Sequence, residues 1–196
     1  TGSPEILNGR VKTLHPKIHG GILAVRGNDD HDQDLQKNEI GHLDMVVVNL
    51  YPFSEAVAKG GSFAQCMENV DIGGPCMLRA SAKSNQAVIC VTNPNQYTDL
   101  MTIMGANGCC TTTELRVKYA AAAFQHSAAY EAAIANYMRQ QEEKSSTASA
   151  PSGESKDVTA AAAAAPPPDF IARSYSRSMT LKYGCNPHQQ QCKRNI

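Results

Sequence analysis

Two short apolar runs, each rich in β-branched residues and each followed by polar turn formers, constrain the fold of this chain most. They occupy residues 45–48 and 87–91. Continuous apolar runs of this length are typical of parallel strands that are buried on both faces. Helical patterns lie between the two runs and after the second. This alternation predicts an α/β domain in which helices cover a parallel sheet.

The helices are predicted from caps and apolar spacing. Ser62 and Gln65 have the spacing of a capping box, which predicts a helix over residues 62–69. Pro75 suits the first turn of a helix that continues to about Ser84. After the second strand we expect a helix over 94–104, followed by a helix pair over 113–125 and 127–140 in which Ser127 caps the second member.

Composition excludes several classes of protein. A chain of 196 residues with 42% hydrophobic content suits one globular domain and a tail. Its 18 basic residues balance 18 acidic ones, so no overall field attracts nucleic acid or an anionic membrane. No apolar run approaches the roughly 20 residues that span a bilayer, and residues 1–4 lack the features of a signal peptide. These features favour a cytoplasmic protein.

The cysteines and histidines do not predict a metal site. The seven cysteines include no Cys-x-x-Cys pair, so reduced thiols in the core or in loops are expected rather than disulfides or zinc ligands. Cys109 and Cys110 are adjacent in a polar stretch and would be prone to oxidation if exposed. For His15 and His19 we expect packing or hydrogen bonding.

The composition changes at Gln141 to Glu, Ser, Ala and Pro, with six alanines over 160–165 and three prolines over 166–168. Such a segment cannot bury enough apolar surface to fold, although a short helix in the alanines stays open. We therefore divide the chain into a domain over 1–140, a disordered linker over 141–179 and a short final segment over 180–196.

A polyanion-binding loop is predicted over residues 8–16, which read NGRVKTLHP. Arg10, Lys12 and Thr13 supply a planar fork of donors, a point charge and a hydroxyl, a set that suits a phosphate monoester. On its own, this segment is better explained as an exposed surface loop. The neighbouring motifs favour the phosphate site.

Three further segments add polar groups. Tyr51 directly follows a predicted strand, where open parallel sheets place ligand sites; Pro52 restricts its conformation, and Phe53 is expected to be an apolar plug. Asp71 precedes two glycines and a helix start, so it either caps the helix or orients a substrate amine. Lys83 lies farther along the same helix and is predicted to reach the same pocket.

Taken in this order, the segments resemble the IMP cyclohydrolase domain of the bifunctional AICAR transformylase/IMP cyclohydrolase family. The resemblance covers residues 1–137 and resumes at 181–189, which are similar to the start of the transformylase domain. It implies a three-layer fold like that of methylglyoxal synthase, a homodimer, and a purine nucleotide monophosphate as ligand. The implied reaction is the dehydrative closure of formyl-AICAR nucleotide to IMP, which needs no metal or cofactor. The transformylase domain would use 10-formyltetrahydrofolate.

The resemblance also implies roles for particular residues. The implied catalytic residues are Lys12, Tyr51, Asp71 and Lys83. The implied substrate-binding residues are Arg10, Thr13, Val48, Asn49, Ile72, Gly73 and Gly74, and on the transformylase side Lys182 and Tyr183. Three positions depart from the family pattern: Ser84 and Asn85 follow Lys83 in place of asparagine and histidine, and Lys182 replaces an arginine.

The opening βα units of the family precede the point at which this sequence begins. We therefore expect an uncovered sheet edge or apolar face, weak nucleotide binding and little turnover. Three interpretations stay open: a cyclohydrolase domain, a noncatalytic nucleotide-binding or dimerisation remnant, and a nonfunctional product of a truncated coding sequence.

Overall fold

The computed structural model describes residues 2–148, 177–180 and 192–194. In chain order its elements are η1 (Leu7–Gly9), α1 (Pro16–Leu23), α2 (Asp29–Lys37), β1 (Met45–Val47), α3 (Phe53–Ala58), α4 (Phe63–Glu68), α5 (Gly73–Lys83), β2 (Ile89–Val91), η2 (Pro94–Gln96), α6 (Tyr97–Ala106), α7 (Thr113–Ala148), β3 (Arg177–Thr180) and β4 (Cys192–Arg194). The chain divides into two compact units, Thr1–Ala128 and Ala129–Ile196, and each is described by itself.

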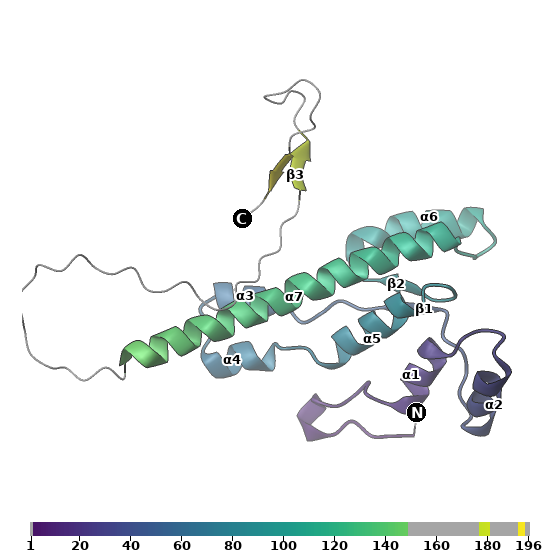
Figure 1. Cartoon of the computed structure of the whole chain (residues 1–196), viewed down its shortest axis with the longest axis horizontal. Helices are drawn as coiled ribbons and strands as arrows, with labels where there is room; N and C mark the ends of the chain where they lie inside the picture. The colour runs from purple at the N-terminus through teal and green to yellow at the C-terminus, as the bar shows by residue number, and fades with distance from the viewer. Residues whose placement is uncertain (1, 149–176, 181–191, 195–196) are drawn as a thin grey trace, which may run out of the picture. The chain divides into compact units, whose positions relative to one another are not determined.

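The first unit contains the predicted parallel strand pair (Figure 1). β1 and β2 are parallel and adjacent, with Val46 opposite Cys90, so this prediction is confirmed. The amide of Val48 donates to the carbonyl oxygen of Val91 at 2.9 Å, which continues the pairing past the end of β1. The carboxyl end of β1 is therefore held against β2.

Helices pack on both faces of this sheet (Figure 1). On one face Leu78 of α5 packs with Val46 and Cys90, and α1 lies beside α5. On the other face, Ile89 and Val91 of β2 form a cluster that α6 and α7 complete with Leu100, Leu115 and Tyr119. The result is a layered α/β core, and α7 contributes to both clusters.

The prediction that both strands are buried on both faces is correct for β2 and wrong for β1. All three residues of β2 are buried, whereas the side chains of Met45 and Val47 are 36% and 51% exposed. Within the described residues β1 pairs with β2 alone. One face of β1 and its unpaired edge are thus uncovered, in agreement with the uncovered edge or face expected from the sequence.

The shorter helices follow their caps. The capping box of α4 is present in both directions, with Ser62 accepting from the Gln65 amide and donating its own amide to the Gln65 side chain. Helix α5 begins at Gly73, two residues before the expected start at Pro75. The helix predicted over 94–104 is divided into η2 and α6. Three further short helices, α1, α2 and α3, were not predicted.

The predicted helix pair is one helix, which corrects both the pair and the start of the linker. α7 runs unbroken through 36 residues, and Ser127 is buried within it at 3% exposure instead of capping a second helix. The segment contains neither glycine nor proline, so nothing in it interrupts the backbone hydrogen bonds. Residues 141–148 are therefore helical, and the rest of the predicted linker up to residue 176 lies outside the described residues.

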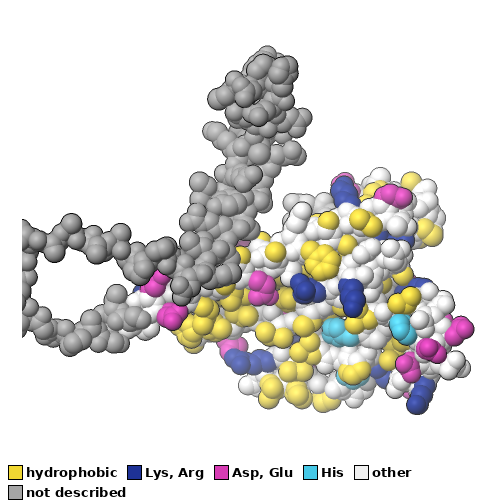
Figure 2. Space-filling view, viewed as in Figure 1, with side chains coloured by type: hydrophobic (Ala, Val, Ile, Leu, Met, Phe, Trp, Pro, Cys, Tyr) yellow, Lys and Arg dark blue, Asp and Glu magenta, His cyan; other side chains and the backbone are white. Residues whose placement is uncertain are grey.

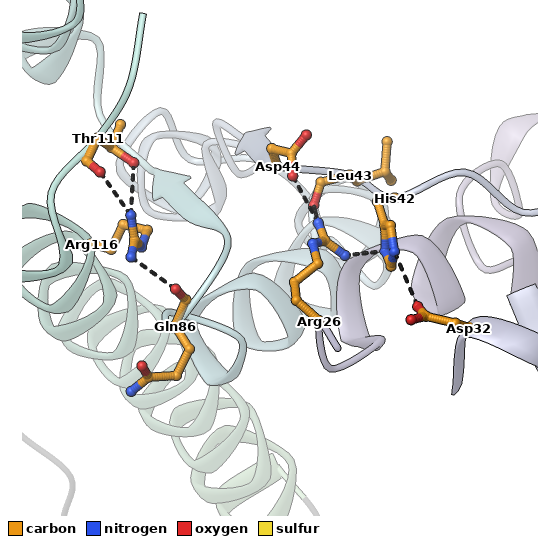
Figure 3. Close-up of polar contacts among 8 residues, drawn as sticks. All are labelled: Arg26, Asp32, His42, Leu43, Asp44, Gln86, Thr111 and Arg116. Carbon is orange, nitrogen blue, oxygen red and sulfur yellow. Dashed lines mark hydrogen bonds and ion pairs between the residues drawn. The ribbon is translucent and has the colours of Figure 1, made fainter. Parts of the chain in front are cut away.

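Arg116 fixes the start of α7 to the turn between α5 and β2 (Figure 3). Its guanidinium donates to the carbonyl oxygens of Asn85 at 2.9 Å, Gln86 at 2.8 Å and Thr111 at 2.8 Å. A planar fork with several donors suits such a cluster of carbonyls. This arginine is structural and is not available to a ligand.

The second unit contains the end of α7 and two short strands. β3 and β4 pair antiparallel, with a register shift between Arg177 and Met179. The final segment predicted over 180–196 thus includes one strand of this pair. Lys182 and Tyr183, which the resemblance assigned to the transformylase side, lie outside the described residues.

Candidate functional site

The predicted anion-binding loop is a hairpin turn. Ile6 and Val11 form an antiparallel bridge, and the amides of Gly9 and Arg10 close the turn onto the carbonyl oxygens of Ile6 and Leu7. Gly9 has a φ of +87°, a conformation that favours glycine. The turn presents Arg10 and Lys12 one residue on either side of Val11.

Both cations of the hairpin contact carboxylates. Arg10 forms a hydrogen-bonded ion pair with Glu68, the last residue of α4. The ammonium of Lys12 lies 3.4 Å from Glu5, its cross-strand neighbour in the hairpin. A Cβ built on Gly9 would come within 2.8 Å of Glu5 Oε1 and of Lys12 Cε, so this pair lies directly over the glycine.

The connection from α4 to α5 carries the predicted aspartate. Asp71 Oδ1 accepts a hydrogen bond from the Gly74 amide at 2.8 Å, which is the capping role that the sequence left open. The contact satisfies one of the unpaired amides in the first turn of α5. It also holds the carboxylate at the positive end of an 11-residue helix.

Two glycines at the start of α5 let other predicted residues approach. A Cβ on Gly73 would lie 2.4 Å from the Thr13 hydroxyl, and a Cβ on Gly74 would lie 2.9 Å from Leu50 Cδ2. Thr13 follows the hairpin, and Leu50 follows β1. The structure therefore brings three of the four predicted segments together at the amino-terminal end of α5.

Residues at the carboxyl end of β1 have different surroundings. Val48 is buried in the core, and the Asn49 side-chain amide donates to the Tyr97 hydroxyl at 3.0 Å. The Tyr51 side chain is 48% exposed, so its phenol is accessible, whereas Phe53 is 1% exposed and forms the predicted apolar plug. Of this segment, Tyr51 alone offers an accessible polar group with the rigidity that Pro52 confers.

Lys83 is not brought next to Asp71. It is exposed and is the last residue of α5, whereas Gly73 is the first. Ten residues of α-helix rise about 15 Å, so the two ends of this helix are far apart compared with the length of a lysine side chain. Ile72, the residue before α5, is 56% exposed at the amino-terminal end.

The histidines of α1 and the buried Cys90 make contacts that stabilise the fold. His15 Nδ1 accepts from the Lys17 amide at 3.0 Å and so caps α1, and His19 Nδ1 lies 3.3 Å from the His15 carbonyl oxygen. Burial raises the pKa of the Cys90 thiol, and a hydrogen bond with Ser81 opposes this in part, so Cys90 stays protonated in the core. In the part of the chain that the structure describes, no three His, Cys, Asp or Glu side chains are placed to hold a metal ion.

A second charged cluster lies outside the candidate site (Figure 3). Arg26 donates to Leu43 O at 3.1 Å and to Asp44 Oδ1 at 2.8 Å, and it also contacts His42. His42 Nε2 lies 3.5 Å from Asp32. These contacts join the segments that flank α2, so we assign the cluster a structural role.

Among the described residues on the face shown in Figure 2, the basic side chains form no continuous field. On the face shown in Figure 2, Lys and Arg are dispersed in small groups among apolar and acidic side chains. This distribution agrees with a local anion site rather than an extended basic surface. No helix among the described residues is both long enough and apolar enough to cross a membrane.

Three neighbours of the site were missed in the sequence: Glu5, Glu68 and Tyr97. The Asn8–Gly9 pair is a strong hairpin signal, and pairing the residues that flank it would have placed Glu5 opposite Lys12. Glu68 and Tyr97 are separated from Arg10 and Asn49 by 58 and 48 positions. No local pattern predicts such contacts.

The parallel sheet, the helices on both of its faces and the glycine-rich helix start define an α/β domain of the MGS-like kind, and the model of that domain matches residues 1–76. A second family model, the AICARFT/IMPCHase bienzyme, matches residues 81–194. The chain belongs to the AICARFT/IMPCHase bienzyme family, and the resemblance found in its motifs is thereby confirmed.

Individual relatives agree with this assignment. The chain is 53% identical over 139 residues to the bifunctional purine biosynthesis protein PurH of Rhodospirillum rubrum, a match that covers 71% of this chain and 26% of the relative. It is 42% identical over 189 residues to PurH of Bradyrhizobium diazoefficiens, covering 96% of this chain and 32% of the relative. The chain thus spans between a quarter and a third of the length of these curated relatives.

A solved structure is also similar. The crystal structure of ForH aligns with a TM-score of 0.58 and 34% sequence identity, over 68% of this chain and 70% of that one. The likeness supports the layered fold of the first unit.

Proposed function

We propose that this chain carries an IMP cyclohydrolase site, which closes formyl-AICAR nucleotide to IMP in de novo purine biosynthesis. One observation supports this most: Thr13, Leu50 and Asp71 meet at the two glycines that begin α5. The segment that follows the hairpin and the start of α5 thereby lie close to a carboxylate that could orient an amide. A surface loop with no ligand would not need this close backbone approach.

The reaction needs positioning and charge stabilisation. The carboxamide nitrogen attacks the formamide carbon and loses one proton. The formamide nitrogen loses a second proton, and the formyl oxygen departs as water with these two hydrogens as a C=N bond forms in the ring. Such a step benefits from a proton acceptor, from cations near the developing oxyanion, and from a tightly held nucleotide. We assign Asp71 to the amide and Lys12 and Tyr51 to the oxyanion, and we assign Lys83 to proton transfer on the family resemblance alone.

The nucleotide would be held at both ends. Arg10, Lys12 and Thr13, together with the amide of Gly73, suit its phosphate, whereas the Gly74 amide already donates to Asp71. Val48, Asn49 and Ile72 would border its base. The position of Lys83 at the far end of α5 gives Lys12 the stronger structural support of the two lysines.

The wider assignments follow from the family. We propose that the complete protein is cytoplasmic and homodimeric and that it also transfers a formyl group from 10-formyltetrahydrofolate, through a domain for which residues 180–196 are the beginning. The alternative is a chain that binds nucleotide or a second subunit without catalysis. IMP binding without turnover would favour this alternative.

Two substitutions test the catalytic assignment. Lys12→Ala and Lys83→Ala should each lower the rate of ring closure by about 100-fold. The Lys83 variant should bind IMP almost normally, and the Lys12 variant should lose less affinity than rate, because Lys12 is assigned both to the phosphate and to charge that develops in the transition state. The rate is followed as IMP formed from formyl-AICAR nucleotide, and affinity by calorimetry.

Lys17→Ala is the matched control, since Lys17 lies on α1 and pairs with Glu39 at 3.8 Å. It should leave both quantities nearly unchanged. Equal losses of rate and affinity in the Lys12 variant would show that Lys12 binds the ground state and would remove it from the proposed chemistry. The purified chain and a complete protein carrying the same substitutions are both assayed.

A further inference from the structure

Two carboxylates form ion pairs with the cations of the hairpin. Glu68 pairs with Arg10, and Glu5 lies 3.4 Å from Lys12. These are the two charged groups that the proposed function assigns to the phosphate. Glu68 accepts from Nη2 of Arg10, and a phosphate bound bidentately through the two terminal nitrogens needs the same nitrogen, so the two anions would compete for it.

We propose that Glu68 and Glu5 are counter-anions that the phosphate of the nucleotide must displace, so that they set the affinity and the selectivity of this site. The inference rests on the proposed function, because it takes the ligand to be a nucleotide monophosphate. Glu68 is well placed for this role: it ends α4, three residues before Asp71, on the connection that leads to the start of α5.

The exposure of these pairs makes the exchange feasible. The side chains of Arg10 and Glu68 are 66% and 58% exposed, and those of Lys12 and Glu5 are 49% and 55% exposed. Exposed ion pairs contribute little to stability and are screened by salt. A phosphate dianion carries nearly twice the charge of a carboxylate and three acceptor oxygens, so it can replace both carboxylates, whereas a singly charged anion gains little by the exchange.

This arrangement predicts selectivity for a phosphate dianion over singly charged anions. Without a ligand, the carboxylates neutralise the hairpin and discourage the binding of weak anions. With a nucleotide monophosphate, each released carboxylate returns to water, at little cost because it is already largely exposed. Removing either carboxylate should therefore strengthen binding of phosphate-bearing ligands and leave ligands without phosphate unaffected.

The test compares IMP with inosine, which lacks the phosphate, as probes of the purified chain. Glu68→Gln keeps the size of the side chain and removes its charge. At low ionic strength it should tighten IMP binding about two- to fivefold, the size expected when an exposed ion pair no longer competes. Inosine affinity should not change, and the gain for IMP should shrink in 0.5 M salt, a concentration at which the Debye length is only about 4 Å.

Glu5→Gln is a second, independent variant with the same expected direction. Glu39→Gln is the matched control, because Glu39 is also an exposed carboxylate beside a lysine, at 3.8 Å from Lys17 on α1. A similar gain in the Glu39 variant would reveal a general effect of net charge and would overturn the proposal.

A double-mutant cycle makes the assignment specific to Arg10. In an Arg10→Gln background the competition is gone, so Glu68→Gln should no longer tighten IMP binding. A gain that persists there would overturn the inference. If the unmodified chain prefers IMP to inosine and Glu68→Gln changes nothing, the inference fails while the proposed nucleotide site stands. If no variant distinguishes IMP from inosine, the phosphate site of the proposed function fails as well.

Discussion

At the scale of single residues, the candidate site depends on two glycines that admit neighbouring side chains. Gly74→Ala would place a Cβ 2.4 Å from Asp71 Oδ2 and 2.9 Å from Leu50 Cδ2. Overpacking of this kind should lower the free energy of unfolding by about 1–3 kcal/mol. Gly105, on α6, has nothing within 4 Å of its Cβ position, so Gly105→Ala should instead raise it by about 0.5–1 kcal/mol.

Urea denaturation followed by circular dichroism measures both changes on one scale. The opposite signs are the essential result, because the two substitutions add the same methyl group to helical glycines. A Gly74 variant as stable as the Gly105 variant would mean that Asp71 and Leu50 do not approach this backbone.

The sequence predicted the local features of single residues but not the contacts between distant ones. The Ser62 capping box and the burial of Phe53 follow from local spacing and polarity, and both are present. The pairing of Arg10 with Glu68 joins positions far apart in the sequence. Charged residues are common on every surface, so their pairing depends on how α4 and the hairpin are placed, which no local pattern encodes.

At the scale of elements, a serine is a helix cap only where the backbone leaves the helix. Ser62 and Ser127 precede similar apolar patterns, which is why both were predicted as caps. Ser62 has an extended ψ of 159° and accepts from the Gln65 amide. Ser127 lies inside α7, where the preceding residues are strong helix formers with neither glycine nor proline. Local spacing alone could not distinguish the two.

Alanine substitution separates these two situations. Ser62→Ala should lower the free energy of unfolding by about 1 kcal/mol, because two amides of α4 lose their partners or their alignment. Ser127→Ala should change it by no more than about 0.5 kcal/mol, since alanine favours a helix interior. Chemical denaturation of the two variants measures this. A loss of 1 kcal/mol or more in the Ser127 variant would restore the interpretation of a capped second helix.

At the scale of the whole molecule, the predicted parallel core is present and one part of it is open. The sequence specified that β1 and β2 are apolar, and their parallel pairing followed from the helices between them. It could not specify how much of β1 is covered, because cover depends on which other segments reach it. Met45 and Val47 are consequently more exposed than their apolar character predicted.

This open strand should make the chain self-associate. Within the described residues, β1 leaves one edge unpaired, and Val47 is 51% exposed beside it. Unpaired strand edges and exposed apolar side chains favour association between copies of the chain. Val47→Lys should therefore reduce the concentration-dependent mass measured by light scattering, because a charge on an edge strand opposes pairing.

Val117→Lys is the control: Val117 is similarly exposed, at 49%, but lies on α7. If both variants reduce association equally, net charge explains the effect; if the unmodified chain is a monodisperse monomer, the open strand does not drive association at all.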